Sequence, residues 1–247
     1  MTTRELSNEF DIHYNSIASN AAPGIDLYEK SVYFTKAQLE LVKNYFNPKG
    51  NKYQKGFENS SKRRYDLKEL IRDYKSNTLI TSSDGISSDS KFFKIPTDSF
   101  LIIQEQAKVN STNTCINNTY LKVVPKTHDE YNTQIKNPFK KPNEKLIWRL
   151  DYYQQSGGNK NVELISPYDI LEYKLRYVMY PKPIILTNLT TAFVGEGLSI
   201  DGQTAEMTCQ LSEGIQREII DRAVELALVD YKPSGVQLKT QIDQRNE

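Results

Sequence analysis

The chain has 247 residues, of which 26% are charged and 38% hydrophobic, and 32 Lys and Arg against 31 Asp and Glu give it a net charge of +1. This length suits one elaborate domain or two modest ones. The near-zero net charge argues against a protein built mainly to grip nucleic acid, which would carry a basic excess. The low apolar fraction predicts a thin core whose burial is completed in part by partner molecules.

The cysteines and the N-terminus exclude several protein classes. Cys115 and Cys209 are too few for a disulfide scaffold, and no Cys-x-x-Cys or Cys/His cluster predicts a zinc site. Residues 1–6 contain no apolar stretch after Arg4, so they do not resemble a signal peptide. No run approaches the ~20 apolar residues that span a bilayer. We therefore expect a chain that is made in the cytoplasm and has no membrane partner.

The first third of the sequence has helical periodicity. Thr3 is the predicted N-cap of a first helix, which we expect to end at the Ala-Ala-Pro-Gly break of residues 21–24. Its apolar side chains recur at helical spacing and predict one buried stripe. The stripe consists of Leu6, Phe10, Tyr14 and Ile17.

Two further helices are predicted before the middle of the chain. Thr35 and Gln38 match a capping box, which predicts the start of the second helix, and the Asn-Pro-Lys-Gly turn of residues 47–50 ends it. The third helix is predicted over residues 61–74. Its inward-facing side chains would be Leu67, Leu70 and Ile71.

The middle third is rich in short stretches of β-forming residues separated by turns, which favours an antiparallel sheet or a small sandwich. We expect the charged segment of residues 127–145 to be a loop. The predicted strands cover residues 78–81, 91–95, 100–103, 120–124, 146–152, 162–165 and 173–180.

The last part of the chain predicts a strong amphipathic helix followed by a polar, extended tail. Ser212 is its predicted cap, and an apolar stripe recurs along it. That stripe consists of Ile215, Ile219, Ala223, Leu226 and Ala227.

The predicted fold class is therefore α+β, in which N-terminal and C-terminal helices form a helical core and a central antiparallel β insertion separates them. The expected organisation has four segments. These are an N-terminal helical segment (residues 1–76), a β-rich insertion (77–210), a C-terminal helix packed on the N-terminal helices (211–232) and an extended tail (233–247).

No catalytic, cofactor or metal site is predicted. His13, next to the first apolar stripe, is expected to be packed or half-exposed, and His128 to form hydrogen bonds within a loop. Gly195 and Gly197 do not belong to a dinucleotide-binding fingerprint, because residue 200 is Ile, and they predict a tight turn instead. Neither a phosphate-binding loop nor a nucleophile elbow occurs. We therefore predict that the protein is not an enzyme and uses no cofactor.

Basic segments and the C-terminal region are the candidate interaction sites. Residues 136–142 interleave Phe139 with lysines, as nucleic-acid-binding loops do, although a solvated loop or an interface rim is the simpler interpretation. The capped final helix and its tail have nothing obvious to hold them in a monomer, which favours an assembly component. The predicted contacts with a portal protein or a neighbouring subunit are Ile215, Arg217, Arg222, Tyr231, Lys232, Val236, Leu238 and Lys239.

Six blocks of sequence, in order and spanning most of the chain, carry a family resemblance. They are Glu-Phe-Asp-Ile at residues 9–12, Tyr-Glu-Lys-Ser-Val-Tyr-Phe-Thr-Lys-Ala-Gln at 28–38, Thr-His-Asp-Glu-Tyr at 127–131, Asn-Pro-Phe at 137–139, the strand ending in Pro-Lys-Pro-Ile-Ile-Leu at 177–186 and the helix at 215–227. Together they resemble the neck proteins of crAss-like phages that infect Bacteroides, specifically the ring proteins that join portal to tail.

This resemblance implies a structural virion protein that forms a ring and acts as a head-to-tail adaptor. Such a protein would dock on the portal, extend the DNA channel and support tail attachment. Its partners would be the portal protein, other neck ring and tail proteins, and copies of itself in a dodecameric ring matching the portal. Genomic double-stranded DNA would pass through without sequence-specific binding. The resemblance places the protein in the neck and tail of the virion, assembled in the cytoplasm of the bacterial host.

Two other function classes remain open at this point. A receptor-binding or glycan-binding β module at the virion surface would suit the Tyr- and Asn-rich middle of the chain, but it would not need the helical ends. A phage hydrolase would need converging titratable residues in a pocket, and a chain with only two histidines offers few.

Overall fold

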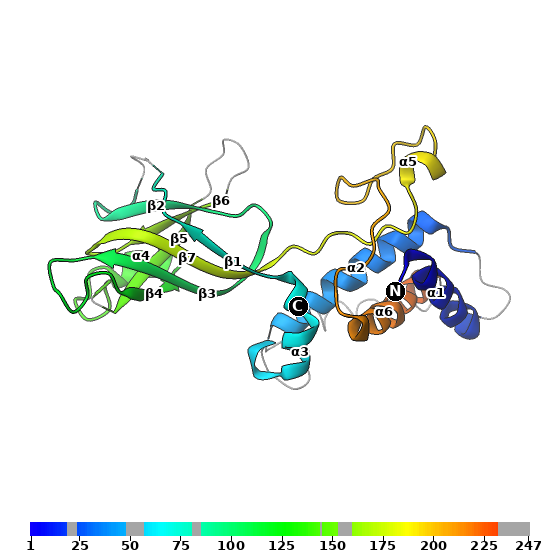
Figure 1. The fold of residues 1–247 in the computed structure, drawn as a ribbon, viewed down its shortest axis with the longest axis horizontal. Helices are drawn as coiled ribbons and strands as arrows, with labels where there is room; N and C mark the ends of the chain where they lie inside the picture. The colour runs from blue at the N-terminus through cyan, green and yellow to red at the C-terminus, as the bar shows by residue number, and fades with distance from the viewer. Residues whose placement is uncertain (19–23, 48–56, 81–84, 144, 153–159, 232–247) are drawn as a thin grey trace. The chain divides into compact units, whose positions relative to one another are not determined.

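A computed structural model describes residues 1–18, 24–47, 57–80, 85–143, 145–152 and 160–231. The chain forms two compact units (Figure 1): a helical unit, Met1–Leu70 with Pro181–Glu247, and a β unit, Ile71–Tyr180. The long helices belong to the helical unit and all seven strands to the β unit, so the predicted α+β class is confirmed.

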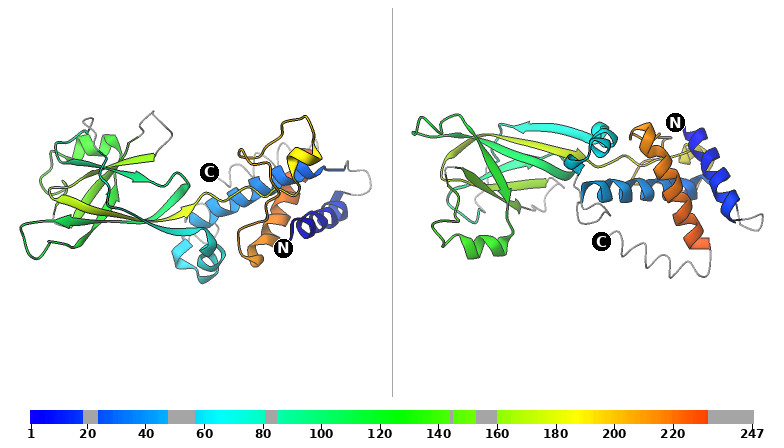
Figure 2. Two further views of the ribbon diagram at one scale, coloured as in Figure 1. Left: turned by 45° about the horizontal axis from the view of Figure 1, so that its top comes forward. Right: turned by 90° about the horizontal axis from the view of Figure 1, so that it is seen from below.

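Three long helices build the helical unit. They are α1 (Thr3–Ala18), α2 (Leu27–Phe46) and α6 (Glu213–Tyr231), and α6 packs against both of the others (Figure 2). The predicted apolar stripes form the core, because every member whose side chain is described is buried. Phe10 lies at its centre, with ring centroids 5.9 Å from Tyr14 and 5.5 Å from Phe34.

The N-cap predictions for the first two helices are wrong. In α1 the cap is Thr2, which exchanges hydrogen bonds with Glu5 (Thr2 N to Glu5 Oε2, 2.8 Å; Glu5 N to Thr2 Oγ1, 3.2 Å). Thr3, by contrast, is buried and donates its hydroxyl to Glu206. A complete capping box needs an acidic or amide side chain three residues after the cap, and Thr2 has one while Thr3 does not.

In α2 the capping box is formed by Asp26 and Glu29, so the helix begins eight residues before Thr35. Thr35 lies inside the helix, where its hydroxyl donates to the carbonyl of Ser31 (2.8 Å). Thr35 and Gln38 match the sequence pattern of a helix start, but their side chains form a tertiary contact instead.

That contact joins one face of α2 to an extended segment, residues 182–186. Side chains spaced four and three residues apart lie on one side of a helix, and here they substitute for a neighbouring strand. The bonds run from Gln38 Nε2 to the Lys182 carbonyl (3.0 Å), from Ile184 N to Thr35 Oγ1 (3.1 Å) and from Leu186 N to Ser31 Oγ (3.0 Å). We call this set the α2 ladder.

Replacing Ser31 by alanine tests the ladder. The buried amide of Leu186 would lose its acceptor, and an unsatisfied buried donor costs about 1–3 kcal/mol of unfolding free energy. Ser16→Ala is the matched control, because the exposed Ser16 hydroxyl bonds only within its own helix. Urea denaturation followed by far-UV circular dichroism compares the two. Equal losses would show that the ladder contributes nothing of its own.

The β unit is one curled seven-stranded sheet (Figure 1), in the order β1-β7-β3-β4-β5-β6-β2. Beyond β1, Ile80 N donates to the carbonyl of Phe92 in β2 (2.9 Å), so the curl brings the two ends of the sheet together. The strands are β1 (Ile71–Ser76), β2 (Ser90–Ile95), β3 (Ser99–Asn110), β4 (Tyr120–Pro125), β5 (Leu146–Tyr152), β6 (Lys160–Ile165) and β7 (Asp169–Met179).

The third helix is much shorter than predicted. After the 3-10 turn η1 (Phe57–Asn59), α3 covers only Ser61–Asp66, and a second 3-10 turn, η2 (Lys68–Leu70), leads directly into β1. Leu67 and Leu70 are fully buried as predicted. The chain beyond them pairs with β7, with Ile71 opposite Val178, so sheet formation overrides the helical spacing of residues 71–74.

The segment predicted as a charged loop contains a helix, α4 (His128–Gln134), which begins with a capping box between Thr127 and Glu130. This segment connects β4 to β5, which are parallel, whereas all other pairs in the sheet are antiparallel. The prediction of an entirely antiparallel sheet is therefore wrong at this pair. A parallel pair needs a crossover of about a dozen residues or more, and residues 126–145 are long enough to form one.

Both faces of the sheet are covered around β5. Its inward side chain Ile147 joins the interior cluster, which includes Phe93, Tyr173 and Leu175. On the outer face, Tyr131 of α4 packs edge-on against Trp148. The alternation of Ile147 and Trp148 thus serves two separate cores.

Candidate interaction surfaces

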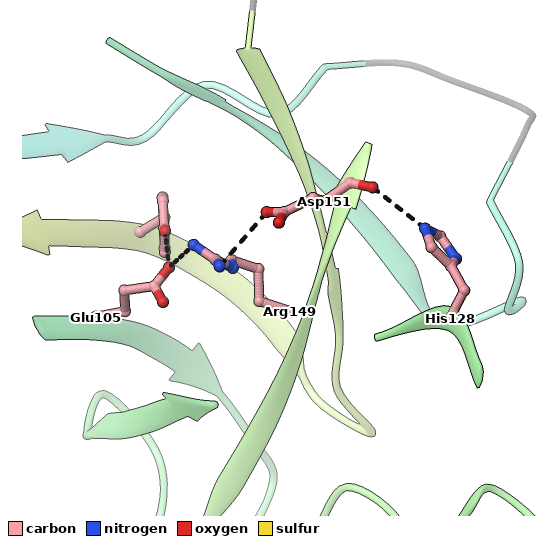
Figure 3. A network of polar contacts seen from close by, with 5 residues as sticks. Glu105, His128, Arg149 and Asp151 are labelled. Carbon is pink, nitrogen blue, oxygen red and sulfur yellow. Dashed lines mark hydrogen bonds and ion pairs between the residues drawn. The ribbon is translucent and has the colours of Figure 1, made fainter. Parts of the chain in front are cut away.

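A buried polar network crosses the interior of the β unit (Figure 3). Arg149 of β5 donates through Nη1 to Oε1 of Glu105 in β3 (3.1 Å), and the hydroxyl of Tyr173 in β7 donates to the same oxygen. The other Arg149 terminal nitrogen, Nη2, lies 3.4 Å from Asp151 Oδ1. His128 approaches the network from outside, with Nε2 3.3 Å from the Asp151 carbonyl.

Burial controls the protonation of this network. Glu105 and Arg149 are only 6% and 8% exposed. Burial raises the pKa of Glu105, although the Arg149 charge and the hydrogen bonds from Tyr173 and Arg149 oppose it. Burial, together with the neighbouring Glu105 charge, raises the pKa of Tyr173 well above 10. Buried ion pairs perturb pKa values as catalytic groups do, and we interpret this one as a structural link between β3, β5 and β7.

Each histidine makes its own polar contact, and the two cysteines differ in exposure. His13 Nδ1 is 3.0 Å from Asp221 Oδ1 on an exposed surface, and His128 is the first residue of α4 rather than a loop residue. Cys115 is exposed, whereas burial raises the pKa of the Cys209 thiol to about 11. Across the described ranges, no group of three His, Cys, Asp or Glu side chains is placed to hold a metal ion. No helix in the described part of the chain is long and apolar enough to cross a membrane.

Helix α6 begins directly after Ser212, as predicted, but the Ser212 hydroxyl donates to Asp66 Oδ1 (2.9 Å). Of the predicted contact residues on α6, Ile215 is fully buried within the helical unit and Arg217 is exposed. The side chain of Tyr231 lies outside the described part of the structure. So do four other predicted contacts, Lys232, Val236, Leu238 and Lys239.

Arg222, also a predicted contact, forms ion pairs inside the subunit. Its guanidinium lies 2.7 Å from Glu40 Oε2 on α2 and 3.0 Å from Glu225 Oε2 one turn along α6. Glu218 makes a second link, because it pairs with Lys62 of α3 and accepts a hydrogen bond from Tyr45 of α2 (2.6 Å). The polar side of α6 therefore ties the helical unit together.

The Glu218 link predicts acid sensitivity of the helical unit. Burial alone would raise the pKa of Glu218, but hydrogen bonds from Lys62 and Tyr45 and the Lys62 charge bring it below 4.5. A carboxyl whose pKa is lower in the folded than in the unfolded chain stabilises the fold above the unfolded-state value. This contribution is lost as the pH falls through the folded-state value.

Unfolding free energy should therefore decrease more steeply below about pH 4.5 in the unmodified protein than in Glu218→Gln. Urea titrations followed by circular dichroism at several pH values measure this difference. Glu58→Gln, which removes an exposed carboxylate of η1, should keep the steep dependence. A Glu218→Gln profile parallel to that of the unmodified protein would contradict the assignment.

Two exposed loops carry large apolar side chains. In residues 136–142, Asn137 organises a turn: its Oδ1 accepts from Phe139 N (3.0 Å), and its carbonyl accepts from Lys140 N and Lys141 N (3.1 Å each). The Phe139 side chain within this turn is 90% exposed.

The second loop follows the short helix α5 (Leu189–Ala192). Gly195 and Gly197 adopt φ angles of +87° and +64°, which confirms the predicted tight turn. Val194 beside them is 82% exposed, while Phe193 packs edge-on against Tyr28 of α2.

Comparison with known proteins shows what kind of protein carries these surfaces. Residues 1–238 match the family model described as phage tail ring protein 3/4. The chain is 41% identical over 251 residues to "Ring protein 4/5" of Bacteroides phage crAss001, covering all of both chains. It is 34% identical over 230 residues to "Ring protein 3" of the same phage, covering 93% of this chain and 96% of that protein. The chain therefore belongs to the phage tail ring protein 3/4 family of crAss-like phages and is a structural ring protein of the virion.

Proposed function

We propose that this chain forms a ring in the neck of the virion, where it docks on the portal, extends the DNA channel and supports attachment of the tail. The observation that carries the proposal is the match to ring proteins over nearly the whole chain. One surface that binds a different surface of the next copy closes a ring when repeated about an axis. A dodecameric ring would match the portal, and the proposed role is mechanical rather than enzymatic.

The helical unit and the tail would make the portal contact. Arg217 is exposed on α6, and the C-terminal residues follow directly where α6 ends at Tyr231. Ile215 and Arg222 make their contacts inside the subunit, so we assign them the role of holding α6 in place. The proposed portal contacts are Arg217, Tyr231, Lys232, Val236, Leu238 and Lys239.

Truncation after Tyr231 tests this assignment. The shortened protein should keep the circular dichroism spectrum and urea midpoint of the full chain, because the described cores lie before residue 232. It should no longer cap purified portal in negative-stain images, whereas the full chain should. Normal capping by the truncated protein would exclude the tail as the portal contact. Free trimers or monomers of the full chain beside uncapped portals would instead favour a surface-binding module.

The charge balance supports passage of DNA rather than its retention. Each phosphate that a cation neutralises adds affinity for DNA, and a chain with net charge +1 offers little cationic excess. We therefore infer that genomic DNA slides through the ring without sequence-specific binding. The ring would assemble in the bacterial host cytoplasm, where it would join the other neck ring and tail proteins.

A further inference from the structure

The turn around Phe139 presents an aromatic side chain among three exposed lysines. Phe139 is the most exposed of the large apolar side chains in the described structure. Asn137 holds its backbone with three hydrogen bonds, so the exposure belongs to an ordered turn. Lys136, Lys140 and Lys141 are all exposed, and within the described residues none of them forms an ion pair. We call Phe139 with these lysines the Phe139 loop.

The carboxylate closest in sequence among the described residues does not neutralise the loop. Glu130 pairs with Lys126 (3.5 Å) and completes the capping box of α4. The complement of the Phe139 loop is therefore an apolar spot flanked by carboxylates. Double-stranded DNA would attract the lysines, but its bases are stacked and its grooves display mainly polar edges. An exposed phenylalanine accordingly favours a protein partner over DNA.

The chain carries such a surface on the outward side of α1. Ile12 is 66% exposed although it lies in the middle of a helix whose opposite side is buried. Glu9 and Glu5, three and seven residues earlier, lie on the same side of the helix. The pKa of Glu5 is lowered, chiefly by its hydrogen bond from the Thr2 backbone, so this carboxylate is charged at neutral pH. We call Ile12 with Glu5 and Glu9 the α1 face.

We propose that the Phe139 loop of one subunit packs on the α1 face of the next subunit, with Phe139 covering Ile12 and the lysines beside Glu5 and Glu9. The two surfaces come from different parts of the chain and opposite charges meet, so the contact is of the head-to-tail kind that closes rings. This inference rests on the proposed ring assembly and names the contact between copies. It is independent of which residues touch the portal.

Mixing two defective variants of the full chain gives the sharpest test. Unmodified protein should associate into species larger than dimers in analytical ultracentrifugation. Phe139→Asp and Ile12→Asp should each weaken association at least about tenfold, because each places a charge in an apolar contact. Phe139→Asp keeps its α1 face and Ile12→Asp keeps its loop, so an equimolar mixture should form dimers and nothing larger.

A charge exchange tests the electrostatic part of the contact. Lys140→Glu and Glu9→Lys should each weaken association, and the chain carrying both should recover it. Lys122→Glu, an exposed substitution on β4, is the matched control and should associate normally.

Three results would overturn the proposal. They are an unmodified chain that stays monomeric at every concentration, a Phe139→Asp variant that associates like Lys122→Glu, and a charge exchange that fails to restore association. If rings form through this contact but do not cap the portal, the proposed function fails and this inference stands. If Phe139→Asp rings form and cap the portal normally, only this inference fails.

Discussion

Replacing Glu105 by alanine should lower the unfolding free energy of the β unit by about 3–5 kcal/mol, the usual cost of removing one partner of a buried ion pair. Arg149, 8% exposed, would keep its charge without the carboxylate that now lies 3.1 Å away. Its Nε already has no hydrogen-bond partner among the residues that the structure describes. Tyr173 would also lose the acceptor of its hydroxyl. Urea denaturation followed by fluorescence of Trp148, the single tryptophan and a β-unit residue, measures the loss.

Two controls separate the burial of the pair from its charge. Lys91→Ala breaks the more exposed pair with Asp169 (3.5 Å), and it should cost less than about 1 kcal/mol. The double variant Glu105→Leu with Arg149→Met removes both charges and should recover most of the loss, because apolar replacement of a buried pair is often close to neutral. If the double variant were as unstable as Glu105→Ala, the network would contribute more than charge compensation.

Phe34→Ala should lower the unfolding free energy of the helical unit by about 3–5 kcal/mol. The substitution removes buried apolar contacts and leaves a cavity that the surrounding side chains fill only in part. Phe34 is fully buried and its ring packs edge-on against Phe10, with centroids 5.5 Å apart. Circular dichroism at the helical minimum follows the unfolding of this unit.

Val32→Ala is the matched control for Phe34→Ala. Val32 lies two residues away on the same helix but is 40% exposed, and surface substitutions usually change stability by less than about 0.5 kcal/mol. Equal losses in the two variants would show that Phe34 does not organise this core.

The periodic elements of the fold could be predicted from the sequence because their pattern is local. The stripes of α1 and α6 repeat at helical spacing, and Leu146–Tyr152 alternates across a sheet whose two faces are both covered. The extent of β3 could not be predicted, because the apolar run of residues 100–103 gives way to Gln104, Glu105 and Gln106, although the strand continues to Asn110.

The errors arise where distant parts of the chain decide the structure. Thr35 has the sequence signature of a helix cap, but it binds Ile184, which lies 149 residues further along. The side-chain spacing of residues 71–74 also fits a helix, but these residues pair with β7 instead. The signal for α4 was present in Thr127 and Glu130, which form a regular capping box.

The candidate sites were predictable to different degrees. The Phe139 loop was identified from its composition, and the structure adds the turn that exposes it. The Glu105–Arg149 pair was missed because β4 lies between their strands in the sheet. A charged Arg149 between the apolar Trp148 and Leu150 was the one local hint, since an alternating strand directs it to the opposite face from both. The buried position of Ile215 follows from its place in the apolar stripe of α6.

The division of the chain into units also determines the order in which its parts can fold during translation. The β unit, Ile71–Tyr180, is one continuous stretch, whereas the described helices of the other unit come from both ends of the chain. Domains generally fold as units while the N-terminal part is made first, so the β unit can fold while the ribosome is still translating. Helices α1 and α2 must wait for residues 182–186 and α6 to emerge. We therefore expect a nascent subunit to expose its unpaired N-terminal helices until α6 has emerged, which delays its entry into a ring until then.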